Sequence, residues 1–476
     1  KRNCSMTRKT KIIATIGPSC SKPTVLKKMI QKGVNVCRLN FSHLNLEKAK
    51  EIISSVKTIN QELSVHTAIM ADLQGPKIRI KKIHNKTGEL NTVVGQKIRI
   101  GNSKDCDLSV DYRGFVKDIK KGDSVLIEDG KIILKVLETD KKTYATLKSM
   151  SSGVVKERKG INLPDTNIKM KSMTKKDFSD LKFVLSENIE WIAMSFVRKK
   201  EDVISLQRRI KKSSSTAKVI AKIEKPEAVK NIDEIIECAD GIMIARGDLG
   251  VELPAHKVPV LQKKIVNKCR FASKPCIIAT QMLESMTNNF SATRAEINDV
   301  SNSVFDGADA LMLSGETSIG IQPLKVVDTM RKTIKDAEKS MEDFEFKKIK
   351  GRVSTNRKVA DNICKNAVKA ANDLKAKAII SATYSGYSAL KVSSYRPRAF
   401  IYAFTNNHSI LNTMSIFWGV VGIYYDRGST TDQLVQETIE VLQKNKIVKR
   451  GDLVINTASM PAKEKGGTNT LKISRV

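Results

Sequence analysis

The stretch KVIAKIEKPEAVKNIDEIIECADGIMIARG, residues 218–247, contains two short apolar runs separated by a segment that favours a helix. The runs 218–224 and 241–247 are nearly continuous in apolar residues, which is typical of parallel strands covered on both faces. Strands that alternate with helices form parallel sheets, because each helix returns the chain to the same end of the sheet. This stretch therefore predicts one unit of an α/β fold.

The same alternation recurs along the chain. Segments that favour helices, such as 45–60 and 255–271, follow most of the apolar runs. Eight such runs predict a closed (β/α)8 barrel, the TIM-barrel fold. The predicted strands are residues 11–17, 34–42, 67–73, 190–197, 218–224, 241–247, 275–281 and 310–316.

The spacing of the predicted strands is regular except after the third one. There, alternating apolar and polar residues with turn signals at 121–123 and 129–130 indicate a β-rich insertion. A charged stretch at 338–352 indicates a linker helix and a boundary, after which strands and helices alternate as in an open α/β domain. We therefore expect a barrel in two parts, 1–73 and 162–338, an inserted β-barrel-like domain at 74–161, and a C-terminal α/β domain at 339–476.

Composition limits the class of protein. The chain has 476 residues, 41% of them hydrophobic, which is enough for several buried cores. Its eight cysteines include no Cys-x-x-Cys pair, so we expect the reduced thiols of a cytoplasmic protein. We expect no membrane span, because polar residues interrupt the longest uncharged run, 399–425. The first residues lack the apolar core of a signal peptide, and Met6 is a candidate for the natural start.

The net charge of +34 is the most unusual bulk property of the chain. It could indicate a nucleic-acid-binding protein. However, the lysines are spread along the whole chain, without an RNA-binding aromatic motif or the spacing of a zinc finger. We therefore favour a lysine-rich surface on a protein that handles anions, with no nucleic-acid partner.

Polar residues stand at the carboxyl ends of most predicted strands, where barrel enzymes carry their catalytic groups. Any one of them could be a solvated strand end or a local ion pair, but together they converge on one rim of the barrel. They are Arg38, Asn40 and Ser42 after the second strand, Asp72 after the third, Lys222 and Glu224 after the fifth, Arg246, Gly247 and Asp248 after the sixth, Thr280 and Gln281 after the seventh, and Ser314 and Glu316 after the eighth.

The residue types at this rim suit a metal ion and an anion. Glu224 and Asp248 are carboxylates from adjacent strands, and Mg²⁺ usually binds one or two carboxylates plus water and substrate oxygens. Lys222 is two residues from Glu224 and so shares its face of the strand. The turn ARGDLG offers backbone N–H groups to an anion, and Arg38 and Arg79 are fork-shaped donors for phosphate. This set predicts phosphoryl transfer or the stabilisation of an enolate.

Several long motifs, in the right order and spanning almost the whole chain, resemble the signatures of pyruvate kinase. The resemblance implies transfer of a phosphoryl group from phosphoenolpyruvate to ADP, giving pyruvate and ATP, with Mg²⁺ or Mn²⁺ as cofactor. It also implies a mobile lid, a C-terminal effector domain and a homo-oligomer, usually a tetramer. The motifs are RLNFSH (38–43), DLQGPKIR (72–79), AKIEKPEA (221–228), GIMIARGDLGVELP (241–254), ATQMLESM (279–286), TRAEINDV (293–300) and DGADALMLSGETSIGIQP (306–323).

The resemblance also implies roles for individual residues. Lys222 would stabilise charge on the phosphoryl group in transfer and on the pyruvate enolate. Glu224 and Asp248 would hold the magnesium ion, and the N–H groups of Gly247 and Asp248 would bind the substrate carboxylate. Arg38 and Arg79 would contact the phosphoryl group, and Thr280, with Ser314 and Glu316 behind it, would protonate the enolate through a water chain. The monovalent cation would be bound by Asn40, Ser42, Asp72 and Leu73. The nucleotide would be contacted by Arg38, Asn40, His43, Arg79 and Lys199.

Two of these assignments are open to a simpler interpretation. His43 and Lys199 could equally be charge-paired surface residues.

At Ala292 the chain departs from the family, many members of which carry proline, but this loop difference leaves the site unchanged.

The C-terminal domain keeps the motif TYSGYS, 383–388, whose hydroxyls and helix start suit a phosphate. The last loop, 457–470, lacks the tryptophan and arginine of the animal forms that respond to fructose bisphosphate. We therefore expect an anionic phosphorylated effector of open identity. Its predicted site comprises Thr383, Ser385, Gly386 and Ser388.

Lys77 is the departure that concerns the cofactors. Potassium-requiring members of the family carry glutamate at this position, and they commonly have threonine and lysine in place of Leu73 and Gln74. Lys77 could be one more surface lysine. Alternatively, its ammonium supplies the positive charge that a monovalent cation provides, and it would repel potassium. On that interpretation K⁺ is not required, and the chain resembles the potassium-independent, lysine-containing type.

Two other functions remain to be weighed. A metal-dependent aldolase that handles phosphoenolpyruvate or pyruvate also uses a Glu/Asp metal pair with arginine, but the insertion and the C-terminal domain have no evident purpose there. A nucleic-acid-binding protein on a degenerate enzyme fold is the alternative from another class, since fold alone does not establish activity. Every polar group expected at the strand ends is present, which favours the enzyme.

Overall fold

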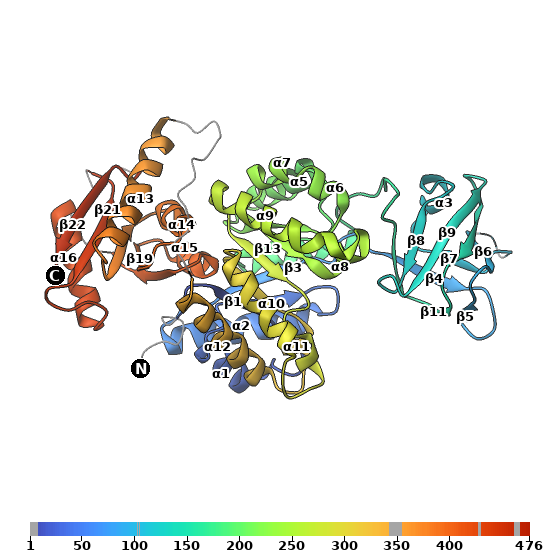
Figure 1. The fold of residues 1–476 in the computed structure, drawn as a ribbon, viewed down its shortest axis with the longest axis horizontal. Helices are drawn as coiled ribbons and strands as arrows, with labels where there is room; N and C mark the ends of the chain where they lie inside the picture. The colour runs from blue at the N-terminus through green and yellow to red at the C-terminus, as the bar shows by residue number, and fades with distance from the viewer. Residues whose placement is uncertain (1–7, 102, 104, 342–354, 427–429, 461–466) are drawn as a thin grey trace.

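The computed structural model describes residues 8–101, 103, 105–341, 355–426, 430–460 and 467–476. The candidate start Met6, most of the predicted linker at 338–352 and residues 461–466 of the last loop lie outside the described residues. The chain forms three bodies in a row, with a barrel in the middle, a small β domain at one end and an α/β domain at the other (Figure 1).

Eight parallel strands close the central barrel, and the predicted TIM-barrel fold is confirmed. They pair in the order β1-β17-β16-β15-β14-β13-β3-β2. Both faces of each strand are buried, which explains the continuous apolar runs in the sequence. The strands are β1 (Lys11–Thr15), β2 (Val36–Asn40), β3 (Ala68–Asp72), β13 (Trp191–Met194), β14 (Lys218–Ile223), β15 (Gly241–Ala245), β16 (Cys276–Ala279) and β17 (Ala310–Leu313).

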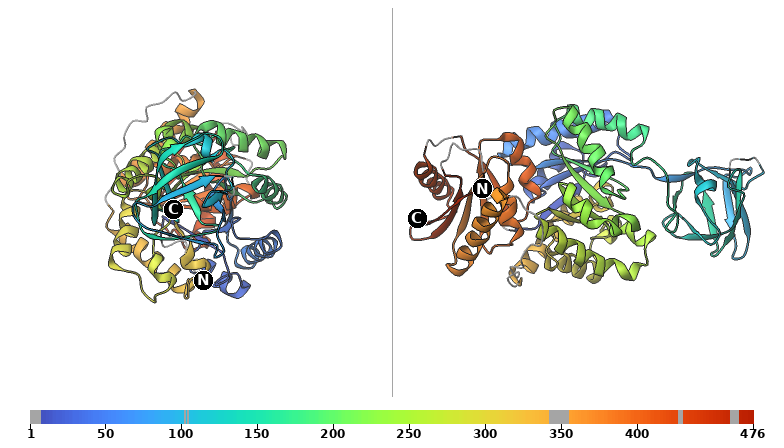
Figure 2. Two further views of the ribbon diagram at one scale, coloured as in Figure 1. Left: turned by 90° about the vertical axis from the view of Figure 1, so that its right-hand side faces the viewer. Right: turned by 90° about the horizontal axis from the view of Figure 1, so that it is seen from above.

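Helices cover the outside of this barrel (Figure 2). Side-chain caps define several of their starts: Asn45 accepts a backbone N–H at α2, and Thr174 and Thr293 form capping boxes at α4 and α10. At these three helices the cap defines where the preceding loop ends. The helices are α1 (Pro23–Gln31), α2 (Leu46–Leu63), α4 (Lys175–Ser186), α5 (Lys200–Lys212), α6 (Pro226–Lys230), α7 (Ile232–Cys238), α8 (Arg246–Glu252), α9 (Val258–Ala272), α10 (Arg294–Phe305), α11 (Gly315–Ser318) and α12 (Pro323–Lys339).

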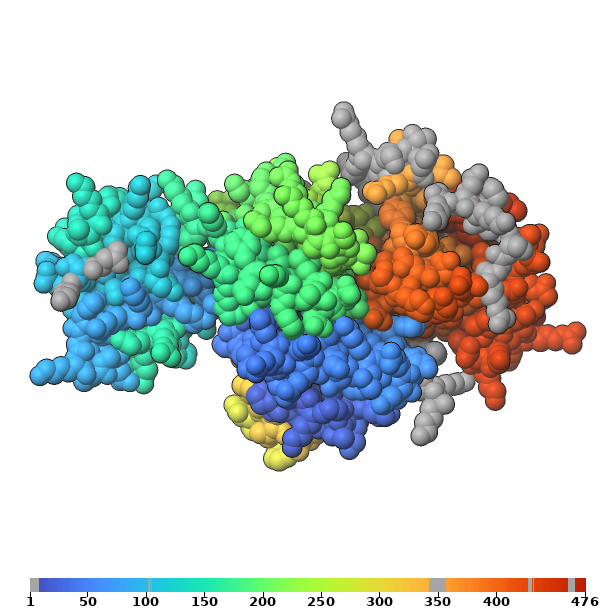
Figure 3. Space-filling model, turned by 180° about the vertical axis from the view of Figure 1, so that it is seen from behind, coloured from blue at the N-terminus to red at the C-terminus, as the bar shows by residue number. Residues whose placement is uncertain are grey.

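The insertion folds as a second closed barrel, which we call the lid, with strands between Ile78 and Asn162. Its order is β10-β6-β7-β4-β12-β8-β9, and β11 and β5 form a separate pair. It has a hydrophobic core of its own and projects from the rim of the large barrel (Figures 1 and 3). The strands are β4 (Ile78–Ile83), β5 (Glu89–Thr92), β6 (Lys97–Gly101), β7 (Leu108–Val110), β8 (Ser124–Ile127), β9 (Ile132–Thr139), β10 (Tyr144–Ser149), β11 (Gly153–Lys156) and β12 (Gly160–Asn162), with one helix, α3 (Phe115–Asp118).

The C-terminal domain is a five-stranded sheet in the order β20-β19-β18-β21-β22. Four strands are parallel, and β22 adds an antiparallel edge. The elements are α13 (Thr355–Asp373), β18 (Ala378–Ala382), α14 (Tyr387–Ser394), β19 (Phe400–Thr405), α15 (His408–Thr413), β20 (Val420–Tyr424), α16 (Thr431–Lys444), β21 (Leu453–Ala458) and β22 (Thr470–Arg475).

This domain packs against the barrel at the end opposite the lid (Figure 1). One apolar cluster continues from the barrel interior into it. Polar contacts cross the same boundary: Lys11 Nζ donates to the carbonyl of Val420 at 2.7 Å, and Arg396 pairs with Asp309 at 3.0 Å. The C-terminal domain therefore covers one end of the barrel. The other end, on the lid side, carries the carboxyl ends of the strands and forms the accessible rim.

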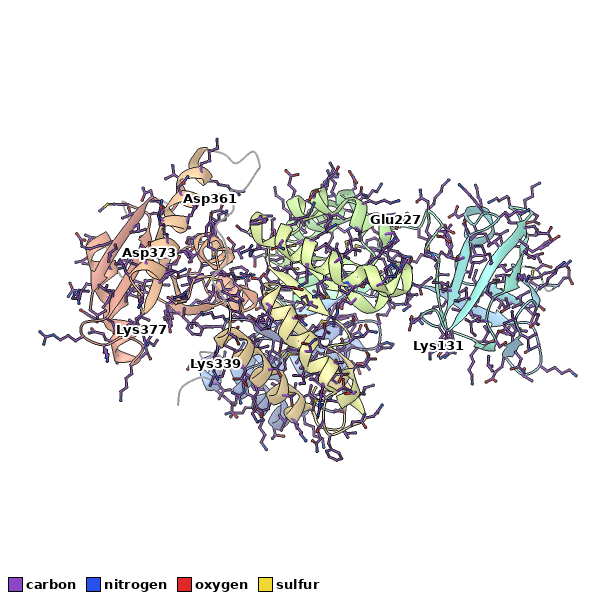
Figure 4. The ribbon with its side chains drawn as sticks, in the orientation of Figure 1. Lys131, Glu227, Lys339, Asp361, Asp373 and Lys377 are labelled. Carbon is purple, nitrogen blue, oxygen red and sulfur yellow. The ribbon has the colours of Figure 1, made fainter. Side chains whose placement is uncertain are left out.

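The excess of lysine is distributed over all three bodies. Lys131 of the lid, Lys339 of the barrel and Lys377 of the C-terminal domain are exposed examples (Figure 4). Within the described part of the chain, none of the helices has the length and apolarity that crossing a membrane requires.

Candidate active site

Lys222 stands at the centre of the rim. It is the fifth residue of β14, and its ammonium lies 2.9 Å from Glu224 Oε1, 3.2 Å from Asp72 Oδ1 and 2.8 Å from the hydroxyl of Ser195. Its side chain is only 11% exposed, and an isolated ammonium there would cost several kcal/mol. Burial alone lowers the pKa of Lys222, but Asp72 and Glu224 outweigh it and hold the pKa above its usual value. The lysine is therefore a fixed positive charge.

Asp72 connects this lysine to Arg38. The guanidinium of Arg38 donates to Asp72 Oδ2 through Nε at 2.7 Å, and Nη2 is equally close to the same oxygen. Nη1 donates to the hydroxyl of Thr15 at 2.8 Å. Burial raises the pKa of Asp72, but Lys222 and Arg38 together hold it below the usual range. One buried carboxylate thus aligns two cationic groups from different strands, Arg38 on β2 and Lys222 on β14.

Glu224 and Asp248 bring two carboxylates to the other side of Lys222. Glu224 is buried and accepts the N–H of Phe196 at 2.7 Å, whereas Asp248 is partly exposed in the first turn of α8. Burial raises the pKa of Glu224, and the charge of Asp248 raises it further despite Lys222 nearby. Two carboxylates thus lie near each other at the rim, and carboxylate oxygens are ligands that suit a hard cation.

The donor chemistry fits a hard divalent ion. Among the described residues no group of three or more histidine, cysteine, aspartate or glutamate side chains forms a metal site. Mg²⁺ does not require one, since it usually binds one or two carboxylates and completes its shell with water and substrate oxygens.

Gly247 and Thr280 form the next part of the rim. The N–H of Gly247 donates to Thr280 Oγ1 at 2.7 Å, and a Cβ on Gly247 would come within 3.3 Å of the same oxygen. Thr280 has φ of 68°, a left-handed conformation that is uncommon for a β-branched residue. Such backbone is concentrated at functional sites.

Ser314 and Glu316 lie beside this strand end. The Ser314 N–H donates to Glu316 Oε2 at 2.6 Å, and Glu316 Oε1 is buried without a hydrogen-bond partner in the described residues. Burial raises the pKa of the Glu316 carboxyl. A buried carboxyl group with a free oxygen can hold or pass a proton.

Arg79 lies on β4 of the lid, and its Nη1 donates to the carbonyl of Arg158, another lid residue, at 3.0 Å. The structure therefore does not bring Arg79 into contact with Lys222 or Arg38 in the described residues.

Lys77, just before β4, reaches the barrel. Its ammonium lies 3.7 Å from Asp248 Oδ1 and 3.8 Å from Asp129 Oδ1, which belongs to the β8–β9 turn of the lid. A Cβ on Gly160 would come within 2.8 Å of Lys77 Cε, so a larger residue there would require the end of the Lys77 side chain to move.

The remaining predicted residues lie on rim loops. The Asn40 side chain accepts the N–H of Ser42 at 3.2 Å, and the carbonyl of Leu73 accepts the Ser195 hydroxyl at 2.8 Å. His43 and Lys199 are exposed.

The predicted effector residues surround the start of α14. Thr383 Oγ1 accepts the N–H of Gly386 at 3.0 Å, and Gly386 has φ of 79°. Ser385 is exposed, whereas the Ser388 hydroxyl is buried against Ser381 at 3.0 Å and faces inward. Asp361 of α13, which is labelled in Figure 4, accepts the hydroxyl of Tyr387 at 2.8 Å and pairs with Lys391 at 3.1 Å, both of α14.

Sequence reasoning missed Ser195 and Thr15. Both are polar residues at the ends of apolar runs, WIAMSFV and KIIATIG, and this was the available signal. The sequence places Arg246 at the end of its strand but indicates no function for it.

Comparison with known proteins gives a consistent result. Residues 7–327 match the pyruvate kinase barrel domain, and residues 361–474 match the pyruvate kinase alpha/beta domain. The pyruvate kinase of Sporosarcina psychrophila is 40% identical, over 98% of this chain and 80% of that protein. The enzyme of Staphylococcus aureus (strain MRSA252) is 38% identical over the same shares. The crystal structure of a pyruvate kinase from Cryptosporidium parvum matches with a TM-score of 0.91 and 32% identity, covering 100% of this chain and 97% of that one.

Proposed function

Since this chain belongs to the pyruvate kinase family and transfers a phosphoryl group from phosphoenolpyruvate to ADP, giving pyruvate and ATP, we propose that Lys222 is its central catalytic residue. The observation that carries this role is the set of contacts from Asp72, Ser195 and Glu224 that holds the ammonium charged and immobile. A preorganised positive charge stabilises negative charge that develops on the phosphoryl oxygens and on the enolate oxygen. Arg38, aligned through Asp72, adds a second donor to the phosphoryl group and the nucleotide.

Glu224 and Asp248 are the residues that would hold Mg²⁺ or Mn²⁺. When bound, the ion would supply positive charge beside the substrate phosphate and carboxylate. The position of the two carboxylates supports this assignment: Glu224 is buried at the rim, and burial together with the nearby charge of Asp248 raises its pKa. The N–H groups of Gly247 and Asp248, in the first turn of α8, would take the substrate carboxylate.

Thr280 would deliver the proton that converts enolpyruvate to pyruvate, through water that Ser314 and Glu316 help to order. Its hydroxyl is next to the carboxylate-binding N–H of Gly247. The free oxygen of Glu316 and its raised pKa support a role as proton reservoir.

The lid would bring Arg79 to the phosphoryl group when it closes. Two points of attachment and a separate core allow it to move as one body. Closure would also exclude water from the reacting phosphate. His43 and Lys199 would contribute to the nucleotide side of the closed site.

Lys77 would take the place of the monovalent cation. Its ammonium lies at the Asp248 carboxylate of the metal pair and, within the described residues, makes no hydrogen bond or ion pair with Asn40, Ser42, Asp72 or Leu73. A charge tethered at the rim nevertheless needs no ion from solution. The ordinary ligands of such an ion, Asp72 and the Leu73 carbonyl, are occupied by Arg38 with Lys222 and by Ser195. The enzyme would therefore not require K⁺.

A phosphorylated effector would bind at Thr383, Ser385 and Gly386. The exposed Ser385 and the left-handed Gly386 at the start of α14 support this site, whereas the inward-facing Ser388 would act only by bracing the turn. The effector would regulate the enzyme allosterically.

Exposed apolar side chains support a homo-oligomer, with a tetramer as the expected form. Phe290, Ile319 and Ile321 are 61%, 63% and 53% exposed, and the backbone of Ile321 bonds to the neighbouring loop at Thr287. The edge strand β22 leaves Ile473 48% exposed at the far end of the chain.

The seven described cysteines are all free, which supports a cytoplasmic location for the enzyme.

The catalytic assignment is tested by Lys222→Met in a coupled lactate dehydrogenase assay with divalent metal supplied. We expect kcat to fall by roughly 10²–10³-fold while phosphoenolpyruvate still binds, as for the loss of one preorganised charge. Lys218→Met is the matched control, because Lys218 lies at the opposite end of the same strand. An equal loss of binding and turnover would contradict the role of Lys222.

A further inference from the structure

Arg246 links two parts of the active site through contacts that the reaction itself does not explain. It begins α8, directly before the carboxylate-binding Gly247 and Asp248. Its guanidinium crosses to the end of the next strand, where Nη2 donates to the carbonyl of Thr280 at 2.7 Å and to that of Gln281 at 3.1 Å. The side chain is 10% exposed, so these bonds are largely shielded from water.

The two carbonyls belong to a strained turn. Thr280 and Gln281 have φ of 68° and 55°, so two successive residues other than glycine are left-handed. Backbone of this kind persists only where its surroundings hold it in place. The hydroxyl of Thr280 accepts the N–H of Gly247 at 2.7 Å and donates to the carbonyl of Ala279 at 2.6 Å.

Arg246 is itself anchored from outside the rim. Nη1 pairs with Asp299 Oδ1, on α10, at 2.7 Å, and lies 3.5 Å from Gln262 Oε1, on α9. A planar guanidinium can serve two carbonyls and a carboxylate at once, whereas a lysine ammonium on a flexible stem cannot hold all three directions.

We infer that Arg246 is a positioning residue for proton transfer: it holds the turn of Thr280 and Gln281 so that the Thr280 hydroxyl stays beside the substrate carboxylate site, and Asp299 anchors it. This inference rests on the proposed role of Thr280. The step concerned forms a C–H bond at the methylene carbon of enolpyruvate. The proton comes from the water chain, and the electron pair of the enolate makes the bond as its oxygen becomes a carbonyl.

Arg246 should affect the rate of proton transfer and the rate of phosphoryl transfer differently, and an assay of overall pyruvate formation does not distinguish the two rates. Arg246 contacts neither Lys222 nor Glu224 through any hydrogen bond or ion pair in the described residues. Its loss should therefore slow proton transfer at carbon more than phosphoryl transfer. Proton transfer can be followed alone as exchange of the pyruvate methyl protons with D2O, by NMR, with Mg²⁺ and inorganic phosphate in place of ATP.

The experiment compares Arg246→Lys, Thr280→Ala and the double variant in the full-length enzyme. We expect Arg246→Lys to slow the exchange by about 10²-fold, the order of magnitude that a misplacement of roughly 1 Å costs. The double variant should be no slower than Thr280→Ala alone, because residues that act through one another are not additive. Arg331→Lys is the control, since Arg331 pairs with Asp328 at 2.6 Å on α12, away from the rim.

The outcomes are distinguishable. If Thr280→Ala exchanges at the wild-type rate, the proposed role of Thr280 is wrong and the inference fails with it. If Thr280→Ala is slow but Arg246→Lys is not, or if the two effects multiply in the double variant, only the inference on Arg246 is overturned. Should Arg246→Lys not fold, Asp299→Asn decides: it keeps the bonds to both carbonyls but weakens their anchor, and it should slow the exchange by less. A wild-type exchange rate in that variant would also overturn the inference.

Discussion

Replacing Lys77 by glutamate tests the proposal that the enzyme needs no potassium, and we expect the variant to respond to potassium. The Lys77 ammonium lies 3.7 Å from Asp248 Oδ1. Two unit charges about 4 Å apart interact by about 4 kcal/mol at an effective dielectric near 20. A potassium ion placed equally close to the ammonium would be repelled by about the same amount. That is roughly 10³-fold in affinity, since about 1.4 kcal/mol is tenfold.

The side chain of Lys77 is 26% exposed, and solvent therefore screens its charge. The repulsion of about 4 kcal/mol is for this reason an upper bound. In Lys77→Glu the repulsion of potassium becomes attraction, while the built-in charge beside the phosphoryl group is lost. We therefore expect low activity without potassium and a marked recovery as potassium is added.

The assay measures pyruvate formation in buffer free of potassium and ammonium, with tetramethylammonium chloride keeping the ionic strength constant. The wild type should be fully active there. Lys81→Glu is the matched control, because Lys81 is an exposed residue on β4 and makes the same change of charge. A wild-type enzyme that potassium stimulates many-fold at constant ionic strength would refute the reasoning, and Lys77 would then be only a surface charge.

Three further predictions follow from other parts of the molecule. Residues 74–161 should move as a rigid lid. Crystal forms or solution scattering with and without substrate and nucleotide should therefore differ in lid angle, and one unchanged position in all liganded states would argue against closure. A phosphorylated sugar or a nucleoside monophosphate should lower the phosphoenolpyruvate concentration for half-maximal rate, and Ser385→Glu should abolish that response by like-charge repulsion; a normal response in the variant would exclude the site. Burial lowers the pKa of Lys11 to about 7, so the unfolded chain binds more protons at this residue above that pH. The contribution of Lys11 to the free energy of unfolding should therefore rise with pH from about 7 towards the ordinary lysine value. Lys11→Met should remove this part of the rise when the free energy of unfolding, from thermal unfolding at several pH values, is plotted against pH. An unchanged pH dependence would contradict the assignment.

Local patterns in the sequence were enough to predict the barrel and which residues lie at the carboxyl ends of its strands. Continuous apolar runs such as 218–224 follow from burial on both faces of a parallel strand, and this is a local property. The spacing of two between Lys222 and Glu224 placed both on one face, and parallel strands bring their carboxyl ends to one edge. Lys222, Glu224 and Asp72 could therefore be expected together before any coordinates.

Which of these groups are in contact depends on how the strands pack in three dimensions. Asp72 lies 150 residues before Lys222 in the chain, yet one of its oxygens accepts Lys222 and the other accepts Arg38. Ser195, directly after β13, completes the same set. The sequence contained these residues, but their pairing depends on the order and register of the closed barrel.

The contacts of Arg246 and Lys77 depend on tertiary structure even more strongly. Arg246 meets Thr280 because two strand ends and α10 converge in space. Lys77 meets Asp248 only through the orientation of the lid on the barrel. Periodic patterns encode which face a side chain occupies, since burial acts on each residue separately. Distances between side chains of different elements are determined only when the whole chain packs, because they depend on the sum of many contacts that no local pattern contains.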